Sequence, residues 1–540
     1  MTCHQIAFAQ GSLTPPGAPG PTMKSLDQIE PRTPISFLPF TITTPGSYYL
    51  TTNLTGVANQ NGISISTNNV TIDLNGFTLS GGGGGSGEAI WSPTAQQNLI
   101  VRNGTVRNWP GSGINFYDGG SSLTIVQNIQ SISNGFTGFA IKNGSRVTDC
   151  IATGNGLRGF IVDNDCLVEH CKAAGSALFG IGAGSNCQLL NNQSIGNTNG
   201  LSITGTNNIV AGNIVRLNMA NYSLAQGNQL DLLLCQVPET ISWPAKVKLA
   251  GSMSVTSGNA ITINASGVTV DLNGFTISST ENPAGTSAAI FLGTVTNVTI
   301  LNGIISSGVV NNAGTYSGKG FGYGIFTGTG ATSNVRVSGI SVSGCQNVGI
   351  ALGDDDSLVE SCTVTTMGAS GISATVVSNS KVKDCGIIGI LAETANNCYA
   401  ENCVSDAINV NVANNCEGGS SGDGDGITSE SANNCIGSSN MGAGVSSSVA
   451  NNCRGSSLSG TGLEANTAND CYGSSNDSYG INAGTTMGCA GTSINGIGLA
   501  AYNAAFCTGS SSGTAIRATI ANGCIANGGT NSVTYKYNMP

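Results

Sequence analysis

The chain has 540 residues, of which 79 are glycine and only 9% are charged, and its formal net charge is −10. With only 18 Lys and Arg residues, it lacks the basic stripe that a nucleic-acid partner requires. Collagen is excluded because glycine does not recur at every third position. The sequence contains no run of 18 apolar residues, so no transmembrane helix is predicted.

Residues 1–34 are predicted to be a leader that precedes the folded core. The triplet Ala7-Phe8-Ala9 is typical of the end of a secretory signal peptide, with a chance match as the alternative. Residues 11–34 are rich in proline and glycine and are expected to be extended. We therefore expect bacterial-type secretion and an extracellular or cell-surface location.

Short alternating strands are expected from residue 35 onward, and they define a first β-helix region over 35–225. Val70, Ile72 and Leu74 share one face through the two-residue period of a strand. From Gly138-Phe139 onward, Gly-aromatic and Gly-aliphatic pairs recur about every 21 residues. Such a period indicates stacked coils of one solenoid.

A long sequence phrase occurs twice and indicates a tandem duplication. VTIDLNGFTL at 70–79 returns as VTVDLNGFTI at 268–277, an offset of 198 residues. Residues 226–245 interrupt the coil pattern and are interpreted as a junction. A second β-helix region is predicted over 246–397.

The segment 398–530 carries the strongest repeat in the chain, ahead of a tail at 531–540. Cysteine recurs every 17 to 19 residues, and an aliphatic residue lies eight positions before each one. The cysteines are Cys398, Cys416, Cys435, Cys453, Cys471, Cys489, Cys507 and Cys524. Each repeat is too short to bury a core alone, so successive coils must stack like on like. The hexapeptide period of a left-handed helix is missing. We predict an all-β, right-handed parallel β-helix (β-solenoid), duplicated in tandem and extended by this cysteine ladder.

The ladder cysteines are interpreted as a buried column of free thiols that act as small apolar residues. Stacked strands bring Cα atoms about 4.8 Å apart, which a disulfide permits. The side chains point the same way, however, and this suits stacking better than an S–S bond. Disulfides and a metal-binding thiolate column are the alternatives.

Three phrases carry a resemblance to a known superfamily. VTIDLNGFTLSG, NLIVRNGTVRN and SLVESCTV resemble right-handed parallel β-helix repeats of the pectate-lyase-like superfamily, over roughly residues 40–530. Its members include lyases, hydrolases, tailspikes and adhesins. The resemblance therefore implies the fold and leaves the activity open.

Four charged residues between 138 and 172 are candidates for a catalytic site. A 21-residue offset stacks Lys142 on Asp163, with Arg158 and Asp165 close in sequence. In a polysaccharide lyase, Lys142 or Arg158 would be the base, and Asp163 or Asp165 would hold a cation. The alternative is a set of ordinary ion pairs between coils, each worth under about 1 kcal/mol.

Two further sets of residues are candidates for ligand binding. Aromatic side chains outside the regular ladder are expected on protruding loops, where they could stack on sugars; they are Trp91, Trp109, Tyr117, Phe321 and Tyr323. The run Asp354, Asp355 and Asp356 could hold Ca²⁺, the only cofactor expected, or could form a solvated acidic turn.

The sequence carries no complete catalytic motif, and it favours surface binding or presentation of carbohydrate over catalysis. A polysaccharide or other glycan is the expected partner. A polysaccharide lyase or glycoside hydrolase is one alternative, and a purely structural fibre or adhesin stalk is the other.

Overall fold

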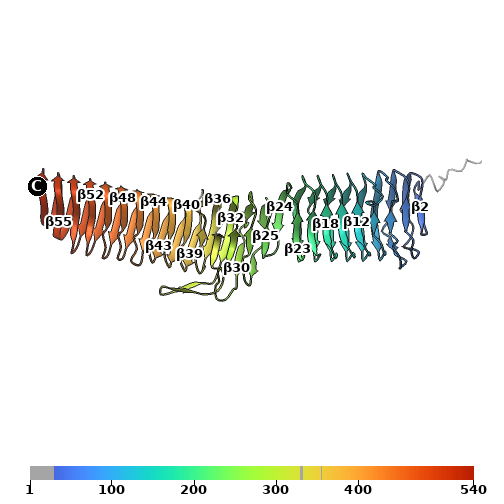
Figure 1. The fold of residues 1–540 in the computed structure, drawn as a ribbon, viewed down its shortest axis with the longest axis horizontal. Helices are drawn as coiled ribbons and strands as arrows, with labels where there is room; N and C mark the ends of the chain where they lie inside the picture. The colour runs from blue at the N-terminus through green and yellow to red at the C-terminus, as the bar shows by residue number, and fades with distance from the viewer. Residues whose placement is uncertain (1–29, 329–331, 354–355, 540) are drawn as a thin grey trace, which may run out of the picture. The chain divides into compact units, whose positions relative to one another are not determined.

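The computed structural model describes residues 30–328, 332–353 and 356–539. The regular secondary structure of these residues consists of β-strands alone. In this described part, no helix is long and apolar enough to cross a membrane. The chain divides into two compact units, residues 1–184 (unit 1) and residues 185–540 (unit 2). Within each unit, strands pair in parallel with those of the next coil, which confirms the expected all-β parallel β-helix (Figure 1).

One series of parallel strands in unit 1 carries the candidate site described below. Its members are β2 (Phe40–Ile42), β5 (Ile63–Ile65), β8 (Ile90–Trp91), β10 (Ile114–Asn115), β12 (Thr137–Ile141), β15 (Arg158–Val162) and β18 (Phe179–Ala183). Their register places one apolar residue of each coil directly over the next, from Ile63 through Ile90, Ile114, Phe139 and Phe160. All five side chains are fully buried.

A second series closes the other side of the same core. It contains β3 (Gly46–Leu50), β6 (Val70–Asp73), β9 (Leu99–Arg107), β11 (Ile125–Ile132), β13 (Arg146–Thr148) and β16 (Leu167–Glu169). Ile72, Val101, Val126, Val147 and Val168 stack in register along it and are fully buried. β-Branched side chains suit such a column because they pack well on a pleated surface.

The duplicated Asp-Leu-Asn-Gly phrase forms the same turn in both units. Asn75 and Gly76 have φ of 52° and 80°, and Asn273 and Gly274 have 55° and 76°. Asp73 Oδ1 accepts the Asn75 N–H at 2.9 Å, as Asp271 does for Asn273 at 2.8 Å. Asn and Gly tolerate these left-handed conformations, so this phrase has a structural role.

In unit 2 the cysteine ladder forms the most regular part of the fold (Figure 1). Its main strands are β42 (Ile390–Asn396), β44 (Ile408–Asn414), β46 (Ile427–Asn433), β48 (Val445–Asn451), β50 (Leu463–Asn469), β52 (Tyr479–Met487) and β54 (Ile497–Ala505). Alanines 395, 413, 432, 450 and 468 stack in register and are fully buried. Asn451 bridges its neighbours in an amide ladder, because its Nδ2 donates to Asn433 Oδ1 and its Oδ1 accepts from Asn469, both at 2.9 Å.

The cysteines of the described residues are free thiols, and all except Cys235 are buried. In the ladder, Cys453 and Cys471 each donate to a backbone carbonyl of the preceding coil, 21 residues earlier in the chain. Cys453 Sγ lies 3.3 Å from Ala432 O, and Cys471 Sγ lies 3.4 Å from Ala450 O. The expected buried thiol column is therefore confirmed.

Two segments of unit 2 differ from the simple coil pattern. The proposed junction contains β24 (Gln229–Leu234) and β25 (Glu239–Ile241), which pair in parallel with other coils, so strand stacking continues through it. β33 (Val310–Asn312) and β34 (Thr315–Ser317) form an antiparallel hairpin. Asn311 Nδ2 and Tyr316 Oη of this hairpin donate to Asp384 Oδ1 at 2.6 and 2.8 Å.

Candidate functional site

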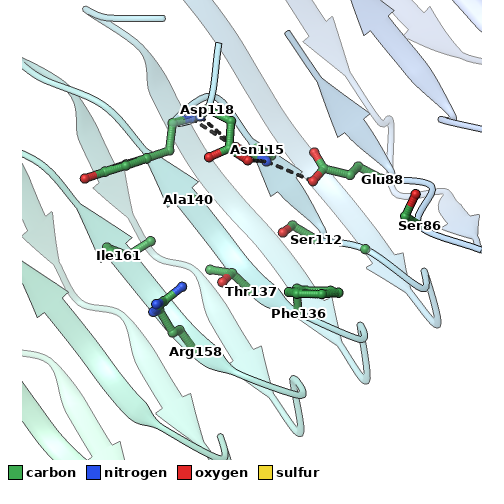
Figure 2. A pocket seen from close by; sticks show the side chains of 12 residues that line it. Ser86, Glu88, Ser112, Asn115, Asp118, Phe136, Thr137, Ala140, Arg158 and Ile161 are labelled. Carbon is green, nitrogen blue, oxygen red and sulfur yellow. Dashed lines mark hydrogen bonds between the residues drawn. The ribbon is translucent and has the colours of Figure 1, made fainter. Parts of the chain in front are cut away.

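A pocket of about 430 Å³ lies on unit 1, over the strands β8, β10, β12 and β15 (Figure 2). Parallel strands at successive heights bring side chains from coils 21 to 27 residues apart onto one surface. The pocket is lined by Ser86, Glu88, Gly111, Ser112, Asn115, Tyr117, Asp118, Phe136, Thr137, Ala140, Arg158 and Ile161.

The same local pattern places the lining residues in each coil. Two buried residues in the middle, such as Gly113-Ile114 and Gly159-Phe160, face the core. The residues on either side of such a pair line the pocket, as Ser112 and Asn115 do in one coil and Arg158 and Ile161 do in another. The pocket is therefore a direct product of the strand register.

Glu88 is the most perturbed carboxyl group in the pocket. Burial raises its pKa to about 7, although a hydrogen bond from Asn115 opposes that shift and the nearby charge of Asp118 adds to it. Asn115 Nδ2 donates to Oε1 at 2.8 Å, while Oε2 is buried without a hydrogen-bond partner. Gly111 makes room for this side chain, since a Cβ there would lie 2.9 Å from Glu88 Cγ.

Asn115 joins Glu88 to a second carboxyl group. Its Nδ2 also donates to Asp118 Oδ2 at 2.7 Å, while its Oδ1 accepts the backbone N–H groups of Tyr117 and Asp118 at 3.1 and 3.2 Å (Figure 2). The amide is therefore fixed in orientation by the turn that follows β10. Because Glu88 Oε1 and Asp118 Oδ2 accept from the same nitrogen, the distance between them cannot exceed the sum of these two hydrogen-bond lengths.

Arg158 brings a cation to the opposite side of the same pocket (Figure 2). Its guanidinium lies 5.3 Å from the centre of the Phe179 ring. Its Nε is buried and has no hydrogen-bond partner. A buried donor without a partner costs free energy, on the order of 1–3 kcal/mol, which a ligand oxygen would recover.

The expected stacking of Lys142 on Asp163 is confirmed, since the two side chains form an ion pair. Lys142 Nζ also lies 4.1 Å from the centre of the Tyr117 ring. The hydrogen bond that the Lys142 ammonium donates to Asp163 is the main cause that raises the Lys142 pKa above its usual value. A lysine held protonated in this way is a poor candidate for the base of a lyase.

The other expected catalytic residues are divided by the structure. Arg158 lines the pocket, whereas Asp165 lies outside the lining, exposed in the turn between β15 and β16 with φ of 59°. The roles expected for these residues in a lyase, Arg158 as the base and Asp163 or Asp165 as the cation ligand, stay predictions.

Two of the five expected sugar platforms are wrong. Trp109 is 1% exposed, and its indole Nε1 donates to Leu79 O at 3.2 Å. Its ring fills space left by Gly56 and Gly62, where any Cβ would collide with it. Phe321 is also fully buried. Both side chains belong to the core, because an aromatic outside the repeat can fill a gap as readily as it can face solvent.

The remaining aromatic residues are half-buried at the surface. Trp91 pairs in register with Asn115, so it lies one coil before the amide at the pocket. Tyr117 lines the pocket itself. Tyr323 belongs to unit 2, where it stacks on Phe326 with ring centres 4.1 Å apart.

The expected calcium site falls mainly outside the described residues. Asp354 and Asp355 lie there, and Asp356 is exposed with φ of 53°. Within the described residues, no group of three or more His, Cys, Asp or Glu side chains is placed to hold a metal ion. Ca²⁺ at this turn stays a prediction.

Sequence reasoning missed Glu88, Asn115 and Asp118, which form the centre of the pocket. These residues are separated by 27 and 3 positions, and the 27-residue coil matches neither the 21-residue nor the 18-residue period. The one available signal was the glycine-rich run 81–87 directly before Glu88, since such a loop lets a backbone approach closely.

No family model and no curated protein matches the sequence. Among solved structures, the chain is similar to the A-module of mannuronan C-5 epimerase AlgE4 from Azotobacter vinelandii, with 15% identity, a TM-score of 0.28, and coverage of 59% of this chain and 86% of that one. It is also similar to a mutant tailspike protein of E. coli bacteriophage HK620 in complex with a pentasaccharide, with 13% identity, a TM-score of 0.23, and coverage of 75% and 70%.

A third similar structure is the catalytic domain of a GH87 alpha-1,3-glucanase in complex with tetrasaccharides, with 14% identity, a TM-score of 0.18, and coverage of 71% and 58%. At these identities the likeness concerns the fold alone. The strand pairing within each unit shows that the chain has a parallel β-helix fold.

Proposed function

We propose that the unit 1 pocket binds carbohydrate. The observation that carries this proposal is the pair of buried polar atoms without partners at the pocket, Glu88 Oε2 and Arg158 Nε. A sugar hydroxyl can donate to a carboxyl oxygen and accept from a guanidinium, so the two side chains that carry these atoms suit a polyhydroxyl ligand. Phe136, 54% exposed at the rim, and Tyr117 offer apolar surface for the C–H face of a sugar ring.

The charge of the pocket favours a neutral or weakly charged saccharide. Arg158 is its one guanidinium among the lining residues, and Asp118 is an exposed carboxyl group on the other side. Lys142 is already paired with Asp163. A polyuronate would bring one carboxylate per residue, and this pocket has too few free cations to neutralise them.

Hydrolysis of a glycosidic bond is the second candidate function, and the pKa of Glu88 favours it. A carboxyl group with pKa about 7 can give its proton to the glycosidic oxygen as the bond to the anomeric carbon breaks. Asp118 would attack that carbon, and water activated by Glu88 would then release the sugar. Retaining enzymes place the two carboxyl groups about 5–5.5 Å apart, and their shared bonds to Asn115 permit such a spacing.

Binding is tested with a glycan array followed by calorimetry on the full chain. Arg158→Gln should weaken binding at least tenfold, since it removes the guanidinium from the pocket. Arg146→Gln is the matched control, because Arg146 lies in the same unit outside the pocket and pairs with Glu169 at 3.5 Å. Equal affinity of the two variants would contradict the proposal.

Hydrolysis is tested by reducing-end release from the glycan that binds. Glu88→Gln should abolish release and keep binding, because the amide keeps the shape but has no proton to give. Asp118→Asn should also abolish release. A product with a 4,5-unsaturated uronate, absorbing in the ultraviolet, would instead support the lyase alternative.

We also propose that the protein acts outside the cytoplasm and presents this pocket at a surface. The signal-like Ala7-Phe8-Ala9 triplet supports secretion. Mass spectrometry of the native N-terminus should find a chain that starts after Ala9. A chain with Met1 retained, recovered from cytoplasm, would contradict secretion, and a blank glycan array would favour the structural stalk.

A further inference from the structure

The strands of unit 2 on either side of the duplicated phrase repeat the framework of the unit 1 pocket. The 198-residue offset places Ile261 of β28 (Ile261–Ile263) where Ile63 lies in unit 1. In unit 2, Ile261 pairs with Ile290 of β31 (Ala288–Leu292), as Ile63 pairs with Ile90. Ile290 then pairs with Ile325 of β35 (Tyr323–Thr327), as Ile90 pairs with Ile114.

This register identifies the unit 2 counterparts of the pocket residues one by one. In the order Glu88, Trp91, Ser112, Asn115 and Ala140, they are Ala288, Phe291, Tyr323, Phe326 and Ala351. The last pair is identical in the two units, because Ala140 and Ala351 are both alanine. The acid is replaced by alanine, while the hydroxyl and the amide are replaced by aromatic rings.

The three aromatic residues form one surface, here called the aromatic shelf (Phe291, Tyr323 and Phe326). Tyr323 and Phe326 are stacked, with ring centres 4.1 Å apart and an interplanar angle of 19°. Phe291 lies 6.1 Å from Phe326 at 53°. All three are half-buried, so each ring is held in place and still presents an edge or face to solvent.

The described residues that pair in register with Phe291 and Phe326 outside the shelf are small and uncharged. Thr262 pairs with Phe291 on one side, and Ala351 pairs with Phe326 on the other. The next coil continues with Ser373 opposite Ala351. A flat apolar ligand face can therefore lie along the shelf without meeting a bulky neighbour, and hydroxyl groups are available at its ends.

We propose that the aromatic shelf is a second saccharide-binding site, and that it binds without cleaving. Sugar rings carry an apolar C–H face that stacks on aromatic side chains, while their hydroxyls remain hydrated. Ala288 supplies no acid in place of Glu88, so the shelf lacks the counterpart of the proposed general acid and leaves the glycan intact. The ligand class rests on the proposed function of the unit 1 pocket, whereas the site itself rests on the register and the ring geometry.

The test uses the full chain in an Arg158→Gln background, in which the unit 1 pocket is disabled. The probes are the hexasaccharides of cellulose, laminarin, amylose and chitin, with binding followed by saturation-transfer NMR and calorimetry. Phe326→Ala and, as a more conservative change, Phe326→Leu should each weaken the remaining binding at least tenfold. Phe506→Ala is the matched control, since Phe506 is a 69% exposed aromatic of the same unit outside the shelf.

The outcomes separate this proposal from the function proposed for the pocket. Binding that survives Arg158→Gln and is lost with Phe326→Ala supports the shelf, even if the pocket itself binds nothing. Loss of all binding with Arg158→Gln alone overturns the shelf and leaves the pocket as the one site. The shelf is also overturned if Phe506→Ala weakens binding as much as Phe326→Ala does. It is overturned too if no probe binds the Arg158→Gln protein, with or without Phe326→Ala. Circular dichroism confirms that each variant is folded.

Discussion

The acidity of Glu88 depends on where the fold places its carboxyl group. The sequence around it, Gly87-Glu88-Ala89, contains no charge that would shift its pKa. The shift comes from burial beneath the next coil, and the Asn115 amide opposes it. Gly111 is as necessary as Glu88 itself, because a side chain at Gly111 would collide with Ser86 O and Glu88 Cγ, at 2.8 and 2.9 Å from its Cβ.

We expect Glu88→Gln to change how stability depends on pH. Because the folded-state pKa of Glu88 is raised from 4.5 to about 7, its protonated form stabilises the fold fully below pH 4.5. That contribution is lost as pH rises through 7. Glutamine does not ionise, so the variant has no such pH-dependent contribution. The free energy of unfolding of the wild type should therefore fall relative to that of the variant as the pH rises from 4.5 through 7. At about 1.4 kcal/mol per pKa unit, discounted for partial exposure, we expect on the order of 2 kcal/mol.

Urea unfolding from below pH 4.5 to above pH 7 checks this expectation. The matched control is Glu169→Gln, whose carboxyl group lies in unit 1 outside the pocket and pairs with Arg146. A difference between the wild type and Glu88→Gln that stays constant with pH would show that Glu88 ionises normally. The proposed role of this residue as a general acid would then have no basis.

At the level of strands and coils, regular spacing decided what could be predicted. The cysteine and alanine columns of unit 2 follow from a constant period, because equal coils put equal positions in register. The Lys142–Asp163 pair follows from the same reasoning with 21 residues. The Glu88–Asn115 contact spans 27 residues, and a coil of unequal length hides its register. Trp109 was misplaced because its burial depends on the empty space at Gly56 and Gly62.

The cysteine column should be chemically silent in the native protein. Outside the ladder, burial raises the pKa of Cys345 to about 12 and that of Cys362 to about 11, so these two thiols stay protonated at neutral pH. In the ladder, Cys453, Cys471 and Cys489 are at most 3% exposed. Cys235, the half-exposed exception, should react with iodoacetamide first among the described cysteines.

Peptide mapping by mass spectrometry after brief alkylation measures this order directly. In urea without reductant, the ladder cysteines should all become labelled, which shows that none was in a disulfide. Rapid native labelling of Cys453 or Cys471 would contradict a dry interior. Failure to label them in urea would instead favour the disulfide alternative.

Considered as a whole molecule, the chain uses one architecture for two different purposes. In unit 1, coils of unequal length leave room for a polar pocket with Glu88 and Arg158. In the ladder of unit 2, the coils are of nearly equal length, and glycines at one position lie in close contact with a neighbouring backbone segment. A Cβ at Gly455 would overlap the carbonyl of Gly462, so glycine is required there for packing.

We expect Gly455→Val to disrupt the ladder while the unit 1 pocket keeps its ligand affinity. In a solenoid each coil contacts only its neighbours, so damage spreads to adjacent coils and weakens with distance along the chain. Forcing a branched side chain into a packed backbone typically costs at least 1–3 kcal/mol. Gly251→Val is the control, since a Cβ at Gly251 meets nothing within 4 Å. Thermal unfolding should show a lower transition temperature for Gly455→Val alone. At temperatures below that transition, the saccharide affinity that depends on Arg158 should be unchanged. Loss of that affinity in Gly455→Val, with affinity retained in Gly251→Val, would mean that the two units do not act as separate folding units.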